Sequence, residues 1–276
     1  MDFKNPNTDI IKDKKLYVFD MDGTIYLGGI PFEFAKRFIK NLRASGKKVL
    51  FFTNNASHTS PFYLKKLERL GFEPQADEIM TSGDVTLEFL KRYRAGKSVY
   101  MVATDELVEE YAAKGINLVN KDPDVREADI VITSFDTSLT YEKLNNACRF
   151  VRNGSEYLST HPDFNCPTED GFIPDSGAIA ALVTASTGKT PTYFGKPYKE
   201  TVEMISEATG FANSEMCIFG DRLYTDIALG KSFGVTSVLV LSGETTEADV
   251  DAALPKDKPD FAFASLDDVD KLMFGA

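Results

Sequence analysis

The chain has 276 residues, of which 43% are hydrophobic and 26% charged, and its formal net charge is −11. This composition is typical of a globular protein with one or two domains, and the negative charge argues against nucleic acid or an anionic membrane as the main partner. No apolar run is long enough to span a bilayer and the N-terminus lacks a signal-peptide pattern, so we expect a cytoplasmic protein. The cysteines Cys148, Cys166 and Cys217 are far apart, which favours reduced thiols over disulfides or a zinc site.

Short apolar runs and amphipathic segments alternate along the chain, as in repeated strand–helix units. The first run, Leu16–Phe19, is expected to be a buried strand, and Asp20 and Asp22 follow it directly. Further strands are expected at 49–52, 98–103, 129–133, 157–160, 217–219 and 237–241, the last of these being the final strand. Helices are expected at 33–45, 60–70, 105–114, 141–153 and 176–187, after Gly195-Lys196-Pro197, and as a tail helix at 266–272.

This alternation predicts an α/β protein with a Rossmann-like, largely parallel sheet as its core. The units in the middle of the chain form a separate series, and a new series opens with Tyr193. We therefore expect a core made of residues 1–84 and 190–276, with a smaller α/β cap, residues 85–189, inserted between them.

Residues suited to chemistry follow four of the expected strand ends. They are Asp20 and Asp22, then Thr53 with Asn54 and Asn55, then Lys196 in Gly195-Lys196-Pro197, and finally Asp221 and Asp226. Since parallel strands bring their carboxyl ends to one edge of a sheet, we expect all four groups to meet there. Clustered carboxylates repel unless a cation pairs with them, and Mg²⁺ with nearby phosphate-binding donors points to phosphoryl transfer.

Four motifs in this order resemble those of the haloacid dehalogenase superfamily. They are Asp20-Met21-Asp22-Gly23-Thr24, Thr53-Asn54-Asn55, Gly195-Lys196-Pro197 and Gly220-Asp221-Arg222-Leu223-Tyr224-Thr225-Asp226. The long insert between the second and third motifs resembles the α/β cap of subclass IIA. That subclass includes phosphatases of N-acetylglucosamine phosphate, p-nitrophenyl phosphate and pyridoxal phosphate.

The resemblance implies a role for each motif residue. Asp20 would attack phosphorus and form an aspartyl-phosphate, and Asp22 would serve as general acid and base. A carboxylate oxygen of Asp20, the backbone carbonyl of Asp22 and the carboxylate of Asp221 would hold Mg²⁺. Thr53 and Asn54 would hydrogen-bond the phosphate, Asn55 would also belong to the substrate-binding residues, and Lys196 would bind the substrate and neutralise charge. Asp226 would orient Lys196 or a metal-bound water rather than bind the metal directly. The implied enzyme is a Mg²⁺-dependent hydrolase of small phosphomonoesters.

Simpler interpretations exist for several of these residues taken singly. Thr53 would serve equally as a helix cap, and Asn54 and Asn55 as turn residues. Lys196 would be an ordinary surface lysine, and Asp226 a helix N-terminal residue favoured by the helix dipole.

The cap is expected to select the substrate. His161-Pro162-Asp163 follows an expected strand, and Asp175-Ser176-Gly177 precedes an expected helix. Relatives often carry Asn-Pro-Asp and Pro-Gly-Ala-Gly at such places, so the preference for a leaving group stays open. We expect His161 to contact the substrate, with a structural histidine as the alternative. Sugar phosphates, nucleotides, pyridoxal phosphate and phosphoglycolate remain candidate substrates, and an exposed cap face would allow a homodimer.

Three other classes of protein share part of this inventory. A phosphoacceptor receiver domain uses similar residues, but it is much shorter and has no inserted α/β unit. A dehalogenase would need Asp20 but neither a general acid at Asp22 nor a metal ligand at Asp221. A protein that binds phosphate esters without turning them over is the remaining alternative.

Overall fold

We describe the fold from a computed structural model, in which residues 9–168 and 170–275 are described. Contacts divide the chain into two compact units. The first unit comprises the described residues up to Thr53, Tyr63–Met80, and the described residues from Ile205 onward. The second unit comprises Asn54–Phe62 and Thr81–Met204. Each unit contains its own parallel sheet flanked by helices, which confirms the predicted α/β class.

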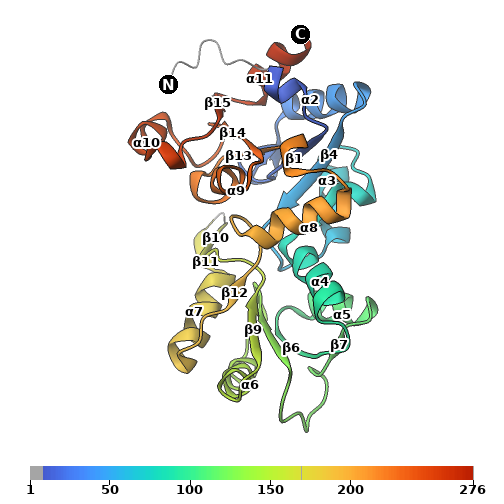
Figure 1. Ribbon diagram of the computed structural model, residues 1–276, viewed down its shortest axis with the longest axis vertical. Helices are drawn as coiled ribbons and strands as arrows, with labels where there is room; N and C mark the ends of the chain where they lie inside the picture. Colours follow the sequence, from blue (N-terminus) through green and yellow to red (C-terminus); the bar gives the residue numbers. More distant parts are fainter. Residues whose placement is uncertain (1–8, 169, 276) are drawn as a thin grey trace. The chain divides into compact units, whose positions relative to one another are not determined.

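The first unit is built on a six-stranded sheet with β1 near its middle (Figure 1). The strand order is β15 (Phe261–Phe263), β14 (Thr236–Val240), β13 (Met216–Gly220), β1 (Leu16–Phe19), β4 (Lys48–Thr53) and β5 (Ile79–Thr81). β1 pairs in parallel with β13 on one side and with β4 on the other. The chain leaves β1 for β4 and only much later returns to β13, so the end of β1 lies where the strand order reverses. Open α/β sheets bind their ligands at such a point.

An aromatic cluster forms the core of the first unit around the central strands. Phe19 of β1 stacks on Phe219 of β13, with ring centroids 4.9 Å apart, and Phe38 packs edge-on against both rings. All three side chains have no exposed surface. This packing fixes the positions of β1 and β13, so the residues that follow these strands start from a rigid base.

Helices flank the sheet of the first unit, and one of them is the tail helix expected from the sequence. The helices that lie wholly within this unit are α1 (Asp9–Lys12), α2 (Glu33–Ala44), α9 (Ala228–Phe233), α10 (Glu247–Ala252) and α11 (Leu266–Phe274). The expected tail helix is α11, which lies beside α2 (Figure 1). Arg37 and Asn41 of α2 both bond to the buried Asp270 of α11.

The second unit is built on a five-stranded parallel sheet. The strand order is β12 (Thr192–Tyr193), β9 (Glu156–Ser159), β8 (Ile130–Thr133), β6 (Ser98–Val102) and β7 (Asn117–Leu118). The helices α6 (Tyr141–Arg152) and α7 (Ser176–Thr187) pack on one face through a shared apolar cluster, while α4 (Ser82–Tyr93) and α5 (Asp105–Ala113) lie on the other side (Figure 1). A hairpin of β10 (Asn165–Thr168) and β11 (Gly171–Pro174) precedes α7.

Short elements complete the chain, and two helices span the division between the units. These helices are α3 (Ser60–Arg69) and α8 (Lys199–Thr209), and β2 (Tyr26–Leu27) pairs with β3 (Ile30–Pro31) just after the first motif. Single turns lie at Ala76–Glu78, Asn213–Glu215, Leu223–Ile227 and Pro255–Asp257. In the part of the chain that the structure describes, no helix combines the length and apolarity needed to cross a membrane.

Two expectations about the strands are wrong. Tyr193 does not open a new series of strand–helix units. It lies in β12, which pairs in parallel with β9 and so belongs to the sheet of the second unit. The motif that contains Lys196 therefore follows a strand of a different sheet from the other three motifs. The strand at 236–240 is not the last one either, because β15 follows it at the sheet edge. Both β12 and β15 are too short to show an apolar period in the sequence.

The aromatic core generates a stability prediction. Phe219→Ala should lower the free energy of unfolding by about 3–5 kcal/mol, because it leaves a cavity between Phe19 and Phe38. Urea unfolding followed by circular dichroism measures this, which suits a chain without tryptophan. Phe172→Ala, at a side chain 76% exposed, is the matched control and should stay within about 0.5 kcal/mol of the wild type. Equal losses for both variants would contradict the central role of the cluster.

Candidate active site

The acidic residues of the first unit converge at the ends of two adjacent strands. Asp20 follows β1, and Asp221 follows β13, the neighbour of β1 in the sheet. The Asp20 N–H donates to the carbonyl of Phe219 at 2.8 Å, which extends the pairing of the strands up to the two aspartates. Asp226 lies one turn further, within a π-helical turn at Leu223–Ile227.

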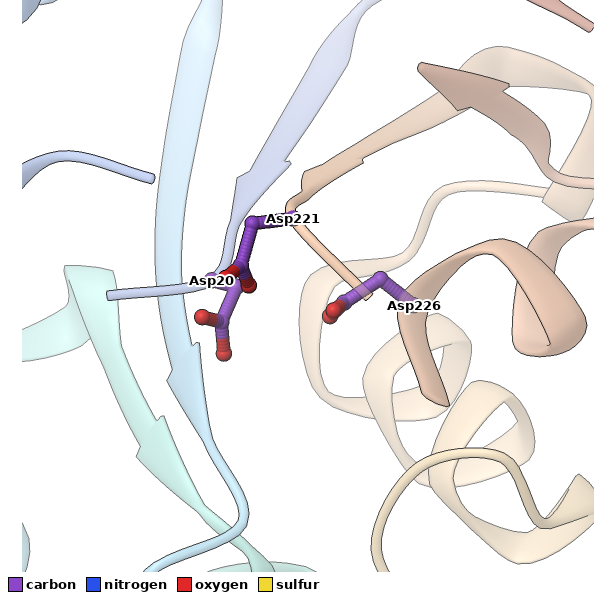
Figure 2. A group of neighbouring side chains, drawn as sticks. All are labelled: Asp20, Asp221 and Asp226. Atoms are coloured by element: carbon purple, nitrogen blue, oxygen red, sulfur yellow. The ribbon is translucent and has the colours of Figure 1, made fainter. Parts of the chain in front are cut away.

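The carboxylates of Asp20, Asp221 and Asp226 form one cluster. One oxygen from each lies within 4.8 Å of those of the other two. Figure 2 shows the side chains pointing toward a common space. Asp221 and Asp226 are almost completely buried and Asp20 is partly exposed. Three charges at this spacing repel one another strongly where water is largely excluded.

Glycines make the cluster sterically feasible. A Cβ atom at Gly23, whose φ is +83°, would lie 2.3 Å from Oδ2 of Asp221. A Cβ atom at Gly220 would lie 2.1 Å from Cγ of Asp226. Any side chain at these two positions would displace the carboxylates, so the glycines of the first and fourth motifs are required by close packing.

The site has the properties expected of a magnesium site. Mg²⁺ prefers hard oxygen ligands and commonly binds through one or two carboxylates together with water and phosphate oxygens. Asp20, Asp221 and Asp226 supply three such carboxylates, and the backbone of Asp221 is anchored by Thr245 N–H. The cluster therefore fits the predicted cation. One Asp226 oxygen lies within the same group, and its expected role in orienting Lys196 or a metal-bound water stays a prediction.

Asp22 lies apart from this cluster and in a different environment. It forms an isolated β-bridge with Tyr26, and its side chain is only partly exposed. Burial raises the pKa of the Asp22 carboxyl above its usual value, although Lys66 and the Gly28 N–H act in the opposite direction. A raised pKa keeps a carboxyl group protonated closer to neutral pH, as a proton donor requires.

Two cationic residues near these carboxylates were not identified from the sequence. The Lys66 ammonium donates to the Tyr26 hydroxyl at 2.9 Å and acts on Asp22. Burial alone would lower the pKa of Arg222, but the Asp20 and Asp221 carboxylates raise it above its usual value. Arg222 directly follows Asp221, so its position in the fourth motif was the available signal, whereas Lys66 lies in a helix with no motif.

The second motif divides between the two units. Thr53 ends β4 in the first unit, and Asn54 is the first residue of the second unit. Asn55 closes a local turn, since its Oδ1 accepts both the N–H and the hydroxyl of Ser57. This is the turn role that the simpler interpretation gave it.

Within the second unit, Asn54 and Lys196 are tied together through the backbone of Lys196. Asn54 Oδ1 accepts the Lys196 N–H at 2.7 Å, and Nδ2 donates to the Lys196 carbonyl at 2.9 Å. The remaining amide proton goes to Asp163 at 3.0 Å. Lys196 is only 2% exposed, so it is not an ordinary surface lysine. Asn54 thus fixes the segment that carries Lys196, a function the sequence did not indicate.

His161 is also placed in the second unit, directly after Thr160 at the end of β9. The side chain has no exposed surface. Its Nε2 lies 2.8 Å from Asp175, which caps α7, and its Nδ1 lies near the hydroxyls of Thr160 and Ser82. The expected contact with substrate stays a prediction for this buried ring.

Comparisons with known proteins agree with the motifs and the fold. Residues 17–117 match the family described as haloacid dehalogenase-like hydrolase, and residues 193–269 match a second one described as HAD-hydrolase-like. An acid sugar phosphatase of Staphylococcus saprophyticus is 34% identical over 262 residues, which are 95% of this chain and 98% of the relative.

Solved structures of phosphatases are similar over nearly the whole chain. A 4-nitrophenylphosphatase from Thermotoga maritima is 39% identical with a TM-score of 0.88, covering 96% of this chain and 99% of its own. A p-nitrophenyl phosphatase from Archaeoglobus fulgidus is 30% identical with a TM-score of 0.86, covering 94% and 99%. The motifs, the parallel sheets and these relatives together show that the chain belongs to the haloacid dehalogenase-like hydrolases.

Proposed function

We propose that the protein is a Mg²⁺-dependent phosphatase that hydrolyses small phosphomonoesters through an aspartyl-phosphate on Asp20. The observation that carries this proposal is the cluster of Asp20, Asp221 and Asp226 at the ends of β1 and β13. A carboxylate in such a cluster is a nucleophile beside a cation site, which is the arrangement that phosphoryl transfer needs. The names of the relatives, acid sugar phosphatase and 4-nitrophenylphosphatase, support a small phosphorylated metabolite as substrate.

The reaction follows from the roles of two aspartates. An oxygen of Asp20 forms a bond to phosphorus while the bond from phosphorus to the leaving oxygen breaks, and Asp22 gives its proton to that oxygen. Asp22 then takes a proton from water, whose oxygen attacks phosphorus. Phosphate leaves and the Asp20 carboxylate is restored.

Other residues bind and neutralise charge. Bound Mg²⁺ would supply positive charge between the carboxylates and the phosphate, held by Asp20, the Asp22 carbonyl and Asp221, with Asp226 close by. Thr53 offers its hydroxyl to the phosphate. Asn54 offers its backbone N–H, because its side-chain amide is engaged by Lys196 and Asp163.

The second unit completes the proposed enzyme. Lys196 would neutralise the charge of Asp20 and the phosphate, and the second unit would act as the cap that excludes water and selects the leaving group. We further propose a cytoplasmic location, and a homodimer through the cap stays a prediction.

Replacing the nucleophile tests the proposed intermediate. Asp20→Asn should lower kcat for p-nitrophenyl phosphate by at least about a thousandfold, since an amide does not attack phosphorus. Phosphate release measures the rate, and mass spectrometry of rapidly quenched wild-type protein should detect phosphorylated Asp20. An Asp20→Asn variant with undiminished turnover would refute this mechanism.

Replacing Asp22 tests its role as general acid. Asp22→Asn should lower kcat/KM, which reports the steps up to departure of the leaving group, by about 10²–10⁴-fold for a sugar phosphate, but by less for p-nitrophenyl phosphate. Nitrophenolate departs readily without a proton, whereas a sugar alkoxide does not. The measurement is the ratio of the two losses in kcat/KM, and equal losses would argue against proton donation by Asp22.

Metal binding has a readout that does not depend on activity. Mg²⁺ should raise the melting temperature of metal-stripped wild-type protein, because a ligand that binds only the folded state stabilises it. Asp221→Asn should abolish most of this shift. Asp251→Asn, an exposed acidic control in α10, should leave it unchanged. A shift that survives in Asp221→Asn would place the metal elsewhere.

A further inference from the structure

A buried charged network runs through the second unit and ends at Asn54. Its centre is His161, whose Nε2 lies 2.8 Å from Oδ1 of Asp175. Its Nδ1 lies 3.2 Å from the Ser82 hydroxyl and 3.0 Å from the Thr160 hydroxyl. His161 and both hydroxyl residues have no exposed surface, and Asp175 is 4% exposed. Buried polar groups of this kind need complete pairing to be tolerated.

The hydrogen-bond partners of the ring indicate its protonation state. Ser82 donates its only hydroxyl proton to the Asn54 carbonyl at 2.5 Å, and Thr160 donates its own to Ser134 at 3.0 Å. Neither hydroxyl has a second proton to offer, so Nδ1 must donate to them. The Asp175 carboxylate can only accept, so Nε2 must donate as well. With the hydroxyl protons placed in this way both ring nitrogens donate, which is the hydrogen-bond pattern of an imidazolium paired with Asp175.

The same network reaches the residues proposed to act on phosphate. Ser82 bonds to both the His161 ring and the Asn54 carbonyl, and the Asn54 side chain holds the Lys196 backbone on both sides. Gly195 packs closely against both Asn54 and His161, since a Cβ there would lie 2.8 Å from Asn54 Oδ1 and 2.9 Å from His161 Cβ. A displacement of the ring would therefore move the backbone of both Asn54 and Lys196.

The segment after His161 is anchored to the start of α7. The Asp163 carbonyl accepts the Gly177 N–H at 2.8 Å, and the Asp175 N–H donates to the Phe164 carbonyl at 3.0 Å. Asp175 Oδ1 also accepts the N–H of Ser176. The N-terminus of α7 thus provides a fixed support on one side of His161, and the Asn54 backbone lies on the other.

We infer that His161 is a positioning residue of the proposed phosphatase site: its imidazolium, paired with Asp175, holds Ser82 and through it the Asn54–Lys196 pair. This inference rests on the proposed function for its consequence in catalysis, but the ring's protonation and contacts stand apart from it. The role differs from a contact with the leaving group. Since Asn54 and Lys196 would act on the phosphoryl group shared by all substrates, loss of the network should affect all substrates alike.

The charged groups around the ring agree with this assignment. Asp175 at the start of α7 and Asp163 in the loop after β9 are negative. Ser82 of α4 and Thr160, directly after β9, are neutral, and Lys196 follows Gly195 in the loop after β12. Burial acts to lower the pKa of His161, but Asp175 and Asp163 raise it above the usual value. The charged form is therefore present below this raised pKa and is lost only as the pH rises through it.

Imidazole NMR tests the protonation state directly. The chain has two histidines, and His58→Gln leaves His161 as the only one. His58 is partly exposed and bonds to Glu106, away from this network, so the variant also serves as an activity control. Both ring nitrogens of His161 should carry protons at pH 7.5, well above the value of about 6.5 for an exposed histidine. A neutral ring at that pH would overturn the inference.

A pair of hydroxyl variants tests the route to Asn54. Ser82→Ala removes the link between the ring and the Asn54 carbonyl, whereas Thr160→Val removes a buried hydroxyl beside the same nitrogen but off that route. Ser82→Ala should lower kcat/KM by about tenfold to a hundredfold, by the same factor for p-nitrophenyl phosphate and a sugar phosphate. Thr160→Val should change kcat/KM by less than about threefold, because it leaves the link between the ring and the Asn54 carbonyl in place. Equal losses in the two variants, or a changed ranking of substrates, would overturn the inference.

Asp175→Asn provides a second readout for the ion pair. Asparagine still caps α7, so the helix start is preserved while the negative charge is removed. The His161 ring should then become neutral near pH 7 in the NMR spectrum, and kcat/KM should fall by the same factor as in Ser82→Ala. A ring that stays doubly protonated would overturn the pairing. Absence of phosphatase activity in the wild type would instead refute the proposed function alone, since the NMR measurements do not depend on turnover.

Discussion

The repulsion between three clustered carboxylates, two of them buried, is the constraint on which the arrangement of the first unit depends. Asp20, Asp221 and Asp226 lie within 4.8 Å of one another, and such a group is unfavourable without a cation. Several features of the fold nevertheless bring these carboxylates together. Parallel pairing of β1 and β13 aligns two of the aspartates, and a π-helical turn brings in the third. Glycines at 23 and 220 leave the space that the carboxylates occupy. Structure that maintains an unfavourable cluster in this way is typical of a functional site.

The second unit holds Lys196 and Asn54 in fixed positions inside a largely buried polar region. Asn54 uses its whole side-chain amide on Lys196 and Asp163, so its position and that of Lys196 are linked. The His161–Asp175 pair supports the same segment from the other side through Ser82. A network in which nearly every donor has an acceptor gives a rigid arrangement, and rigidity of this kind favours catalysis by reducing reorganisation.

Much of the fold was predictable because its signals are local. Buried strands such as Leu16–Phe19 and the amphipathic helix α2 carry clear apolar patterns, and the four motifs follow one another in a recognisable order. The short strands β12 and β15 were not assigned correctly, since two or three residues contain no period and their pairing depends on distant strands. The contributions of Lys66 and Arg222 were missed for a similar reason. A single cation in a sequence does not reveal which carboxylate it will face.

The sequence by itself determined the α/β class, the acidic motifs at the strand ends and the family to which the chain belongs. These follow from residue type and order, and both are fixed before folding. Only the tertiary structure decided which carboxylates come together. Asp226 joined Asp20 and Asp221, while Asp22 lay apart against Lys66. Only the tertiary structure showed that His161 is buried beside Asp175, because burial and hydrogen-bond partners depend on contacts between residues far apart in the chain.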